Sequence, residues 1–276
     1  MLTKRLLDVW LKLEWAKRHT DALKADIQRW CDAESKRLTA WTLIQNFKAD
    51  KQCIVIALGS VELPANCMLM LGDAVYNLRA CLNYLAWDAI RVGSEPNPKH
   101  PLSVEFPIFI ERDKFYHAVK SRLPGISDKL LAVIERHQPY HVAAGVAMVP
   151  GPASPPIAGP ASHPLAILQT LSNSDKHHNP QRTFPQNYGQ LSFDIIGSTD
   201  FVSERLEPAT PFPAVFYTGA EIATAYGKAI GTNPHMDVKL QGSIGIAIEP
   251  GLWLWDALDK IVATLVELIR EIEPLL

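Results

Sequence analysis

The first 30 residues carry an unbroken alternation of four- and three-residue spacings between apolar or small side chains. A pattern of this period predicts one long helix with a narrow apolar seam, whose other faces are charged. Such a seam must be buried along a long partner, which is either a helix of the same chain or a helix of a second copy. We therefore expect a helical core and a homodimer formed through long helices. The seam consists of Leu2, Leu6, Val9, Leu13, Ala16, Thr20, Leu23, Ile27 and Trp30.

Composition places this chain of 276 residues among globular proteins, because 47% of its residues are hydrophobic and can form a sizeable core. The net charge of -2 excludes a surface that is basic throughout, but a local basic patch remains compatible with it. The four cysteines form no C-x-x-C pair, which predicts reduced and buried thiols. No apolar run is long enough to span a bilayer and the first residues are charged, so we expect a cytoplasmic protein without membrane contact.

Helical and strand patterns alternate along the rest of the chain. Residues 40–47 and 52–57 predict a β-hairpin, and residues 64–92 predict a second long helix. Residues 104–110 predict a short edge strand, because Pro107 cannot donate to a ladder. Further patterns predict helices over 114–120, 128–137, 163–174 and 252–272, and strands over 191–196, 214–217, 221–226, 236–240 and 244–248.

These elements predict an α+β fold, in which a core of long helices accompanies a small antiparallel sheet. No internal repeat and no boundary between two cores is visible, so we expect residues 1–276 to form a single domain. Residues 142–164 are rich in Pro, Gly and Ala and predict a long loop, which is either a lid over a site or a plain insertion.

The helix predicted over 64–92 carries short polar side chains where a solvated face would normally carry Lys and Glu. Asp73, Asn77, Tyr84 and Asp88 fall within about 60° of one another around the helix axis, and Arg79 and Asn83 form a flanking stripe. This pattern indicates a semi-buried polar network, which is either structural or functional. Asp73 lies about 120° from Arg79, so we expect the partner of Arg79 to be Asp175 instead.

A second polar cluster, Ser172 to Asn179, ends the helix predicted over 163–174. His177 and His178 beside Asp175 are compatible with a general base and its orienting carboxylate, or with two metal ligands. Adjacent histidines point about 100° apart on a helix, however, and a histidine at a helix end also stabilises the helix dipole. We expect this cluster to meet the Arg79 stripe, because buried polar groups need partners.

The two clusters together resemble an uncharacterised bacterial family. Its pattern is G-D-x-x-x-N-L-R-x-x-L-D-H-L, then F-P-I, then L-x-x-L-x-N-x-D-K-H-R, which this chain matches from Gly72 to Leu85, at Phe106-Pro107-Ile108 and from Leu168 to His178. The R-x-x-x-x-H element of that family is similar to HEPN helical domains, which are dimeric modules that cleave RNA or bind nucleotides. The resemblance implies a HEPN-like helical arrangement.

The resemblance also implies site residues. The catalytic set is Arg79, Asn83, Tyr84 and His177, and the ligand-binding set is Asp73, Asn77, Asp175, Lys176 and His178. Asn83 and Tyr84 stand where the family has Asp and His, and a tyrosine with a pKa near roughly 10 is a poor proton acceptor at neutral pH. His178 stands where the family has Arg, which weakens a phosphate contact.

The residues and the resemblance together support three hypotheses. The first is a HEPN-like protein that interacts with RNA or a nucleotide, as a degenerate ribonuclease in stress or defence, without a cofactor or a metal. The second is a non-enzymatic ligand-binding or protein-interaction protein whose polar network is structural. The third is a metal hydrolase that uses Asp73, Asp175 and His177.

Overall fold

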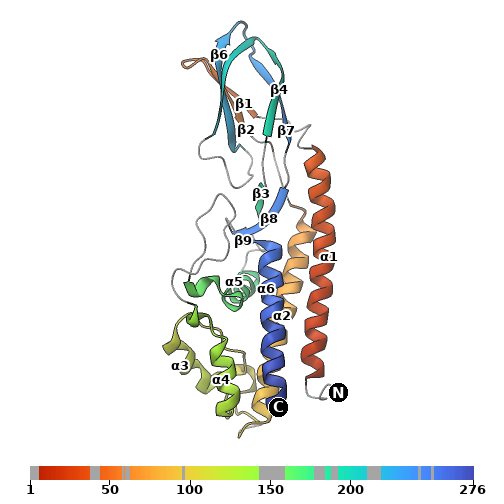
Figure 1. Ribbon diagram of the computed structural model, residues 1–276, viewed down its shortest axis with the longest axis vertical. Helices are drawn as coiled ribbons and strands as arrows, with labels where there is room; N and C mark the ends of the chain where they lie inside the picture. The colour runs from red at the N-terminus through yellow and green to blue at the C-terminus, as the bar shows by residue number, and fades with distance from the viewer. Residues whose placement is uncertain are drawn as a thin grey trace. The chain divides into compact units, whose positions relative to one another are not determined.

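The computed structural model describes most of the chain as helices and strands (Figure 1). The described residues are 6–37, 44–57, 59, 63–94, 97–142, 159–176, 184–187, 192–209, 219–241, 244–249 and 252–276. Although the sequence offered no boundary between two cores, the structure divides into two compact units. Unit 1 consists of Met1–Lys24, Ala65–Arg182 and Leu254–Leu276, and unit 2 consists of Ala25–Pro64 and Thr183–Trp253.

Unit 1 is built from long helices. Helix α1 (Leu7–Arg37) contributes its first part, and α2 (Ala65–Arg91) and α6 (Leu254–Ile272) lie alongside it (Figure 1). Helix α5 (Pro164–Lys176) packs against both α2 and α6. The helical periodicities of the sequence are confirmed, and the predicted α+β class with them.

The seam of α1 is buried within the chain itself. Leu6, Val9, Leu13 and Ala16 are all inaccessible to solvent or nearly so. The Cys81 thiol of α2 donates to the carbonyl of Val9 at 3.5 Å, and burial raises the pKa of this thiol to about 12. The seam is therefore covered by helices of the same chain and not by a second copy. The homodimer stays a prediction, and it would have to form through another surface.

Short helices complete unit 1. Helices α3 (Arg112–Arg122) and α4 (Asp128–Arg136) confirm the two predicted between residues 114 and 137. Of the predicted loop over 142–164, residues 143–158 lie outside the described residues, and Gly159–Ser162 forms a 3-10 turn, η3. This turn packs on another, η2 (Pro139–His141). The remaining 3-10 turns of unit 1 are η1 (Pro101–Ser103) and η4 (Glu273–Leu275).

Unit 2 holds small antiparallel sheets in place of the one sheet that we expected. The predicted hairpin is confirmed as β1 (Ile44–Lys48) and β2 (Cys53–Ala57), within a sheet of order β1-β2-β6-β5. The sequence patterns missed β3, β5 and β9, the last of which was predicted as the start of the helix over 252–272. The strand predicted over 214–217 lies outside the described residues. The other strands are β3 (Phe184–Asn187), β4 (Ser192–Thr199), β5 (Phe201–Pro208), β6 (Glu221–Ala229), β7 (His235–Gln241), β8 (Ile244–Glu249) and β9 (Leu252–Trp253), with β3-β8-β9 and β4-β7 as the further sheets.

None of the helices in the described residues combines the length and the apolar character needed to cross a bilayer.

A histidine caps the start of α5. The Nδ1 atom of His163 accepts a hydrogen bond from the backbone N–H of Leu165 at 3.1 Å. Burial, together with the nearby His137 and His141, lowers the pKa of His163 from 6.5 to about 4. Protonation would remove the accepting lone pair, so the fold requires the neutral form of this ring.

This cap predicts an acid-sensitive fold. As the pH falls from 6.5 to about 4, the unfolded chain binds a proton at His163 before the folded chain does. The free energy of unfolding should therefore fall by on the order of 2–3 kcal/mol across this window, as measured by urea denaturation at stepped pH. In His163→Asn, whose amide oxygen can cap without titrating, this decrease should shrink by that amount. An unchanged decrease would contradict the role of His163.

Candidate functional site

Helix α2 separates the predicted site residues onto different faces. Arg79 and Asn83 are one helical turn apart and share a face, whereas Tyr84 lies about 140° from Arg79 by the helix period. Asn77 and Asp88 are buried, while Asp73 and Tyr84 are exposed. The predicted catalytic residues of α2 therefore do not converge on one point.

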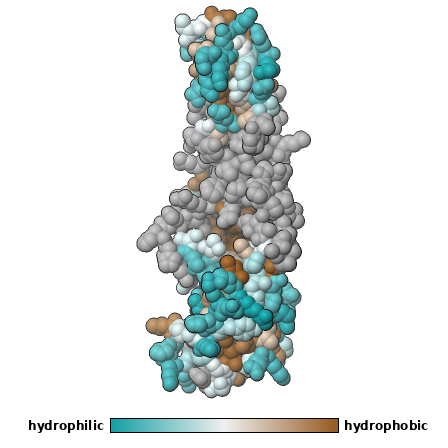
Figure 2. Space-filling view, turned by 90° about the vertical axis from the view of Figure 1, so that its left-hand side faces the viewer, coloured by the Kyte–Doolittle hydropathy of each residue, from teal (hydrophilic) through white to brown (hydrophobic). Residues whose placement is uncertain are grey.

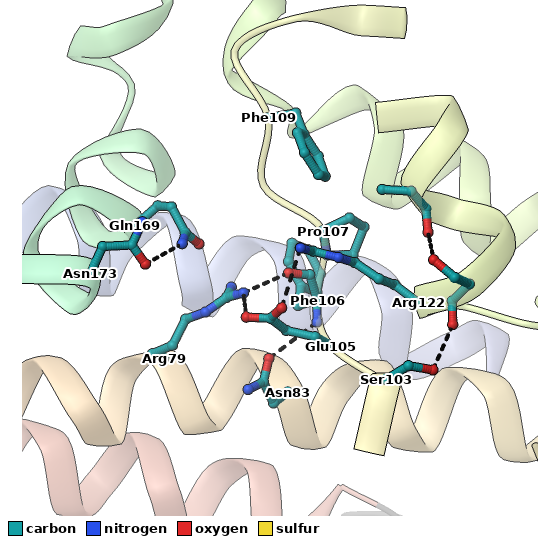
Figure 3. Close-up of polar contacts among 12 residues, drawn as sticks. Arg79, Asn83, Ser103, Glu105, Phe106, Pro107, Phe109, Arg122, Gln169 and Asn173 are labelled. Carbon is teal, nitrogen blue, oxygen red and sulfur yellow. Dashed lines mark hydrogen bonds and ion pairs between the residues drawn. The ribbon is translucent and has the colours of Figure 1, made fainter. Parts of the chain in front are cut away.

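Arg79 is a buried cation that is paired with a carboxylate and a backbone carbonyl. Its side chain is 3% exposed, and Nη2 donates to Glu105 Oε1 at 2.5 Å and to the carbonyl of Phe106 at 2.9 Å (Figure 3). Burial lowers the pKa of the guanidinium, and the charge and hydrogen bond of Glu105 act in the opposite direction. A buried charge is costly unless it is paired. The Glu105 carboxylate therefore offsets the cost of burying the Arg79 guanidinium in the folded protein.

Side chains of α2 and of Gln138 satisfy the backbone of the segment that follows Glu105. Asn83 Oδ1 accepts from the N–H of Phe106 at 3.1 Å. Gln138 Oε1 accepts from the N–H of Phe109 at 3.1 Å, and its Nε2 donates to the carbonyl of Pro107 at 2.9 Å. The edge strand predicted over 104–110 is therefore wrong, because side chains supply the hydrogen bonds that a neighbouring strand would have supplied.

Glu105 lies between two arginines. Its second oxygen, Oε2, is 3.3 Å from Arg122 Nη1 at the end of α3 (Figure 3). The Arg122 guanidinium in turn lies over the ring of Phe109, 5.2 Å from its centroid. We expected Asp175 as the partner of Arg79, but the partner in the structure is Glu105, and the side chain of Asp175 lies outside the described residues.

One edge of Arg79 and one oxygen of α5 are buried without a partner. Within the described part of the chain, Arg79 Nε and Nη1 and Gln169 Oε1 make no hydrogen bond. The other end of the Gln169 amide donates to Asn173 Oδ1 at 2.8 Å (Figure 3). His177, His178 and the side chain of Lys176 lie outside the described residues, so the expected meeting of residues 175–178 with Arg79 stays a prediction.

The α1-facing side of α2 forms a second polar group. Asn77 Nδ2 donates to the carbonyl of Asp73 at 2.8 Å, and Asn77 Oδ1 accepts from Lys12 Nζ at 3.3 Å. The same ammonium lies 5.9 Å and 5.8 Å from the ring centroids of Tyr76 and Tyr84. The ring of Tyr84 therefore faces a lysine of α1.

A groove of about 780 Å³ opens between α1 and α2 beside Tyr84. Trp15 and Leu11, which the sequence analysis did not select, are 51% and 58% exposed there. Asp88 pairs with Arg91 at 3.4 Å, and the Arg91 guanidinium lies 6.0 Å from the centroid of the Trp87 ring. The lining residues are Asp8, Leu11, Lys12, Trp15, Tyr84, Trp87, Asp88 and Arg91, and we call this site the α1/α2 groove.

The sequence contained a signal for the groove. Leu7, Leu11 and Trp15 recur every four residues, outside the buried seam of α1, and all three are exposed. Glu105 was also detectable, as the one charged residue within an otherwise apolar stretch from 104 to 110. Gln138 had no comparable signal, because an isolated glutamine after a helix is unremarkable.

Metal ligands do not gather in the part of the chain that the structure describes. No group of three or more His, Cys, Asp or Glu side chains lies there in an arrangement that could hold an ion. Asp73, a ligand in the metal hydrolase hypothesis, is exposed on α2, and His177 lies outside the described residues.

The contacts of Arg79 predict a loss of stability on its removal. Arg79→Ala removes the donor that Glu105 Oε1 and the carbonyl of Phe106 share and should lower the free energy of unfolding by about 2–4 kcal/mol. Arg122→Ala is the matched control, because Arg122 pairs with the same carboxylate but is ten times more exposed at 32%. We expect that change to cost about 1 kcal/mol or less in the same denaturation experiment. Equal losses in the two variants, or no loss in Arg79→Ala, would contradict the structural role.

Comparison with protein-family models, with curated proteins and with solved structures found no match for this chain.

Proposed function

We propose that this chain is a non-enzymatic protein-interaction protein that binds its partner in the α1/α2 groove. The observation that carries the proposal is the exposure of Leu11, Trp15 and Tyr84 around one groove. Large apolar and aromatic side chains that gather at an exposed concave surface are characteristic of binding sites. We place this function in the cytoplasm, because the four cysteines are buried free thiols.

The engagement of Arg79 and Asn83 supports a structural polar network. Both side chains hydrogen bond to the segment at Phe106, and Arg79 also pairs with Glu105. A catalytic arginine that contacts a scissile phosphate needs access to solvent and to substrate. A guanidinium that is 3% exposed and paired with a carboxylate fits a structural role better than a catalytic one.

The charges of the groove favour a protein over RNA. Asp8 and Asp88 lie in the groove wall and would repel a phosphate backbone. Its two cations are already engaged, Lys12 with Asn77 and two tyrosine rings, and Arg91 with Asp88. A neutral, aromatic wall with both signs of charge is typical of a protein–protein interface.

A second copy of this chain is the partner that we propose. Each helix of the groove brings one acid and one base, Asp8 and Lys12 from α1 and Asp88 and Arg91 from α2. A twofold rotation can therefore place opposite charges across from one another, as an isologous interface requires. The groove thus gives the expected homodimer a surface, now that the seam of α1 is buried.

The groove predicts the oligomeric state. The parent chain should elute as a dimer in size-exclusion chromatography with light scattering. Trp15→Ala combined with Tyr84→Ala should raise the dissociation constant by about tenfold or more, because aromatic anchors dominate interface energies. The control is Ile110→Ser, an equally exposed apolar residue outside the groove, which should leave the dimer intact. A monomeric parent, or equal weakening by the control, would contradict the proposed partner.

A HEPN-like RNA or nucleotide function is the second candidate. The observation in its favour is the free edge of Arg79, which is buried near α5, the helix that leads into the D-K-H-H element. In a HEPN-like ribonuclease of this kind, Arg79 would contact a phosphate of the RNA and His177 would serve as the general base.

An RNA assay separates the two candidates. We expect single-stranded RNA to stay intact when it is incubated with the parent protein, because Arg79 is buried and paired. Gel analysis of labelled RNA is the measurement, with His177→Ala as the matched variant. Cleavage by the parent that His177→Ala abolishes would support the ribonuclease and overturn the non-enzymatic proposal.

A further inference from the structure

A second cavity in unit 1 shares no lining residue with the α1/α2 groove. Its volume is about 530 Å³, which is within the usual range for small-molecule sites. It is bounded by residues that precede and form η1 and by the end of α3. The lining residues are Asn97, Pro98, Lys99, His100, Ser103, Lys120, Ser121 and Pro124.

Hydrogen bonds hold the two walls of this cavity together. Ser103 Oγ lies 2.8 Å from the carbonyl oxygen of His100 and 3.0 Å from that of Ser121, and its single O–H can donate to either, so it links η1 to α3 (Figure 3). On the other side, the N–H of Ser94 donates to the carbonyl of Gly125 at 2.8 Å. The backbones approach so closely there that a Cβ on Gly93 would lie 2.1 Å from the Gly125 oxygen. The cavity is therefore formed by a fixed scaffold, before any ligand binds.

The charged side chains of the described residues that line the cavity are all basic. Lys99 and Lys120 are exposed cations and His100 is a third basic side chain, while no carboxylate of the described residues lines the wall. Neither lysine forms an ion pair within the residues that the structure describes, in contrast to Arg79 and Arg91. In a chain whose net charge is -2, such a concentration of free positive charge marks a place that attracts anions.

We propose that this cavity binds a phosphate group of a small ligand, with Lys99 and Lys120 as the charged contacts and Asn97 as a polar one. Ammonium groups are common phosphate ligands, and charge-assisted hydrogen bonds are stronger than neutral ones. The site does not depend on the proposed groove function, because the two share no residue.

The phosphate group can come from a soluble compound or from a lipid headgroup. Leu102, between His100 and Ser103, is fully exposed at the rim of the cavity. The surrounding surface of unit 1, which carries α3 and α4, is mostly hydrophilic with separate hydrophobic patches (Figure 2). An exposed leucine beside basic side chains is an arrangement by which proteins also contact anionic membrane surfaces.

Calorimetric titration with inorganic pyrophosphate tests the soluble source. The parent chain should bind pyrophosphate, and Lys99→Gln combined with Lys120→Gln should weaken binding by about tenfold or more. The matched control is Lys17→Gln combined with Lys129→Gln, which removes the same charge from exposed positions outside the cavity. Circular dichroism of each variant confirms that it is folded.

Vesicle sedimentation tests the lipid source. If the ligand is a lipid headgroup, the parent protein should sediment with vesicles of phosphatidylcholine and phosphatidylglycerol. It should not sediment with vesicles of phosphatidylcholine alone. Leu102→Ser should lower vesicle binding severalfold without changing the binding of pyrophosphate. Binding of either probe that only the cavity double variant weakens supports the proposal and identifies the source. Binding of neither probe, or equal weakening by the control variant, overturns it.

Discussion

The buried charge of Arg79 fixes how the segment from Glu105 to Phe109 lies against α2. A guanidinium removed from water must find acceptors, and the segment supplies two, the Glu105 carboxylate and the Phe106 carbonyl. Glu105 then reaches Arg122 with its other oxygen, so one carboxylate joins α2 to the end of α3. The position of α3, and with it the wall of the basic cavity, depends on this pairing.

The two faces of α2 therefore contact different parts of unit 1. The face with Arg79 and Asn83 holds the segment at Phe106, while the face with Asn77 and Tyr84 borders α1. Within one copy of the chain, the helix period keeps the side chains of these two faces from pointing to one place. Of the α2 residues that the sequence analysis selected, Arg79 and Asn83 thus contact the segment at Phe106, and Tyr84 borders the α1/α2 groove.

Periodicity predicted the long helices because their buried faces repeat without interruption, as in α1 from Leu6 to Ile27. The same reasoning failed at 104–110. Val104, Phe106 and Ile108 alternate and are buried as in a strand, but the hydrogen bonds go to Asn83 and Gln138. Partners distant in sequence leave no local pattern. For that reason the sequence did not pair Glu105 with Arg79, although Glu105 stands out as the one charge in an apolar stretch. The exposed stripe with Trp15 did leave a four-residue repeat, which was read as part of a charged face.

The unpaired edge of Arg79 bears on the choice between the two candidate functions. Arg79 Nε and Nη1 are donors, whereas the buried oxygen of Gln169 on the neighbouring α5 is an acceptor. Figure 3 places both side chains on the same side of α2. The two side chains therefore need partners of opposite kinds, an acceptor for Arg79 and a donor for Gln169. A fully ionised phosphate only accepts, so it could satisfy Arg79 but not the Gln169 oxygen. The surroundings of Arg79 therefore suit a neutral structural network better than a phosphate of RNA.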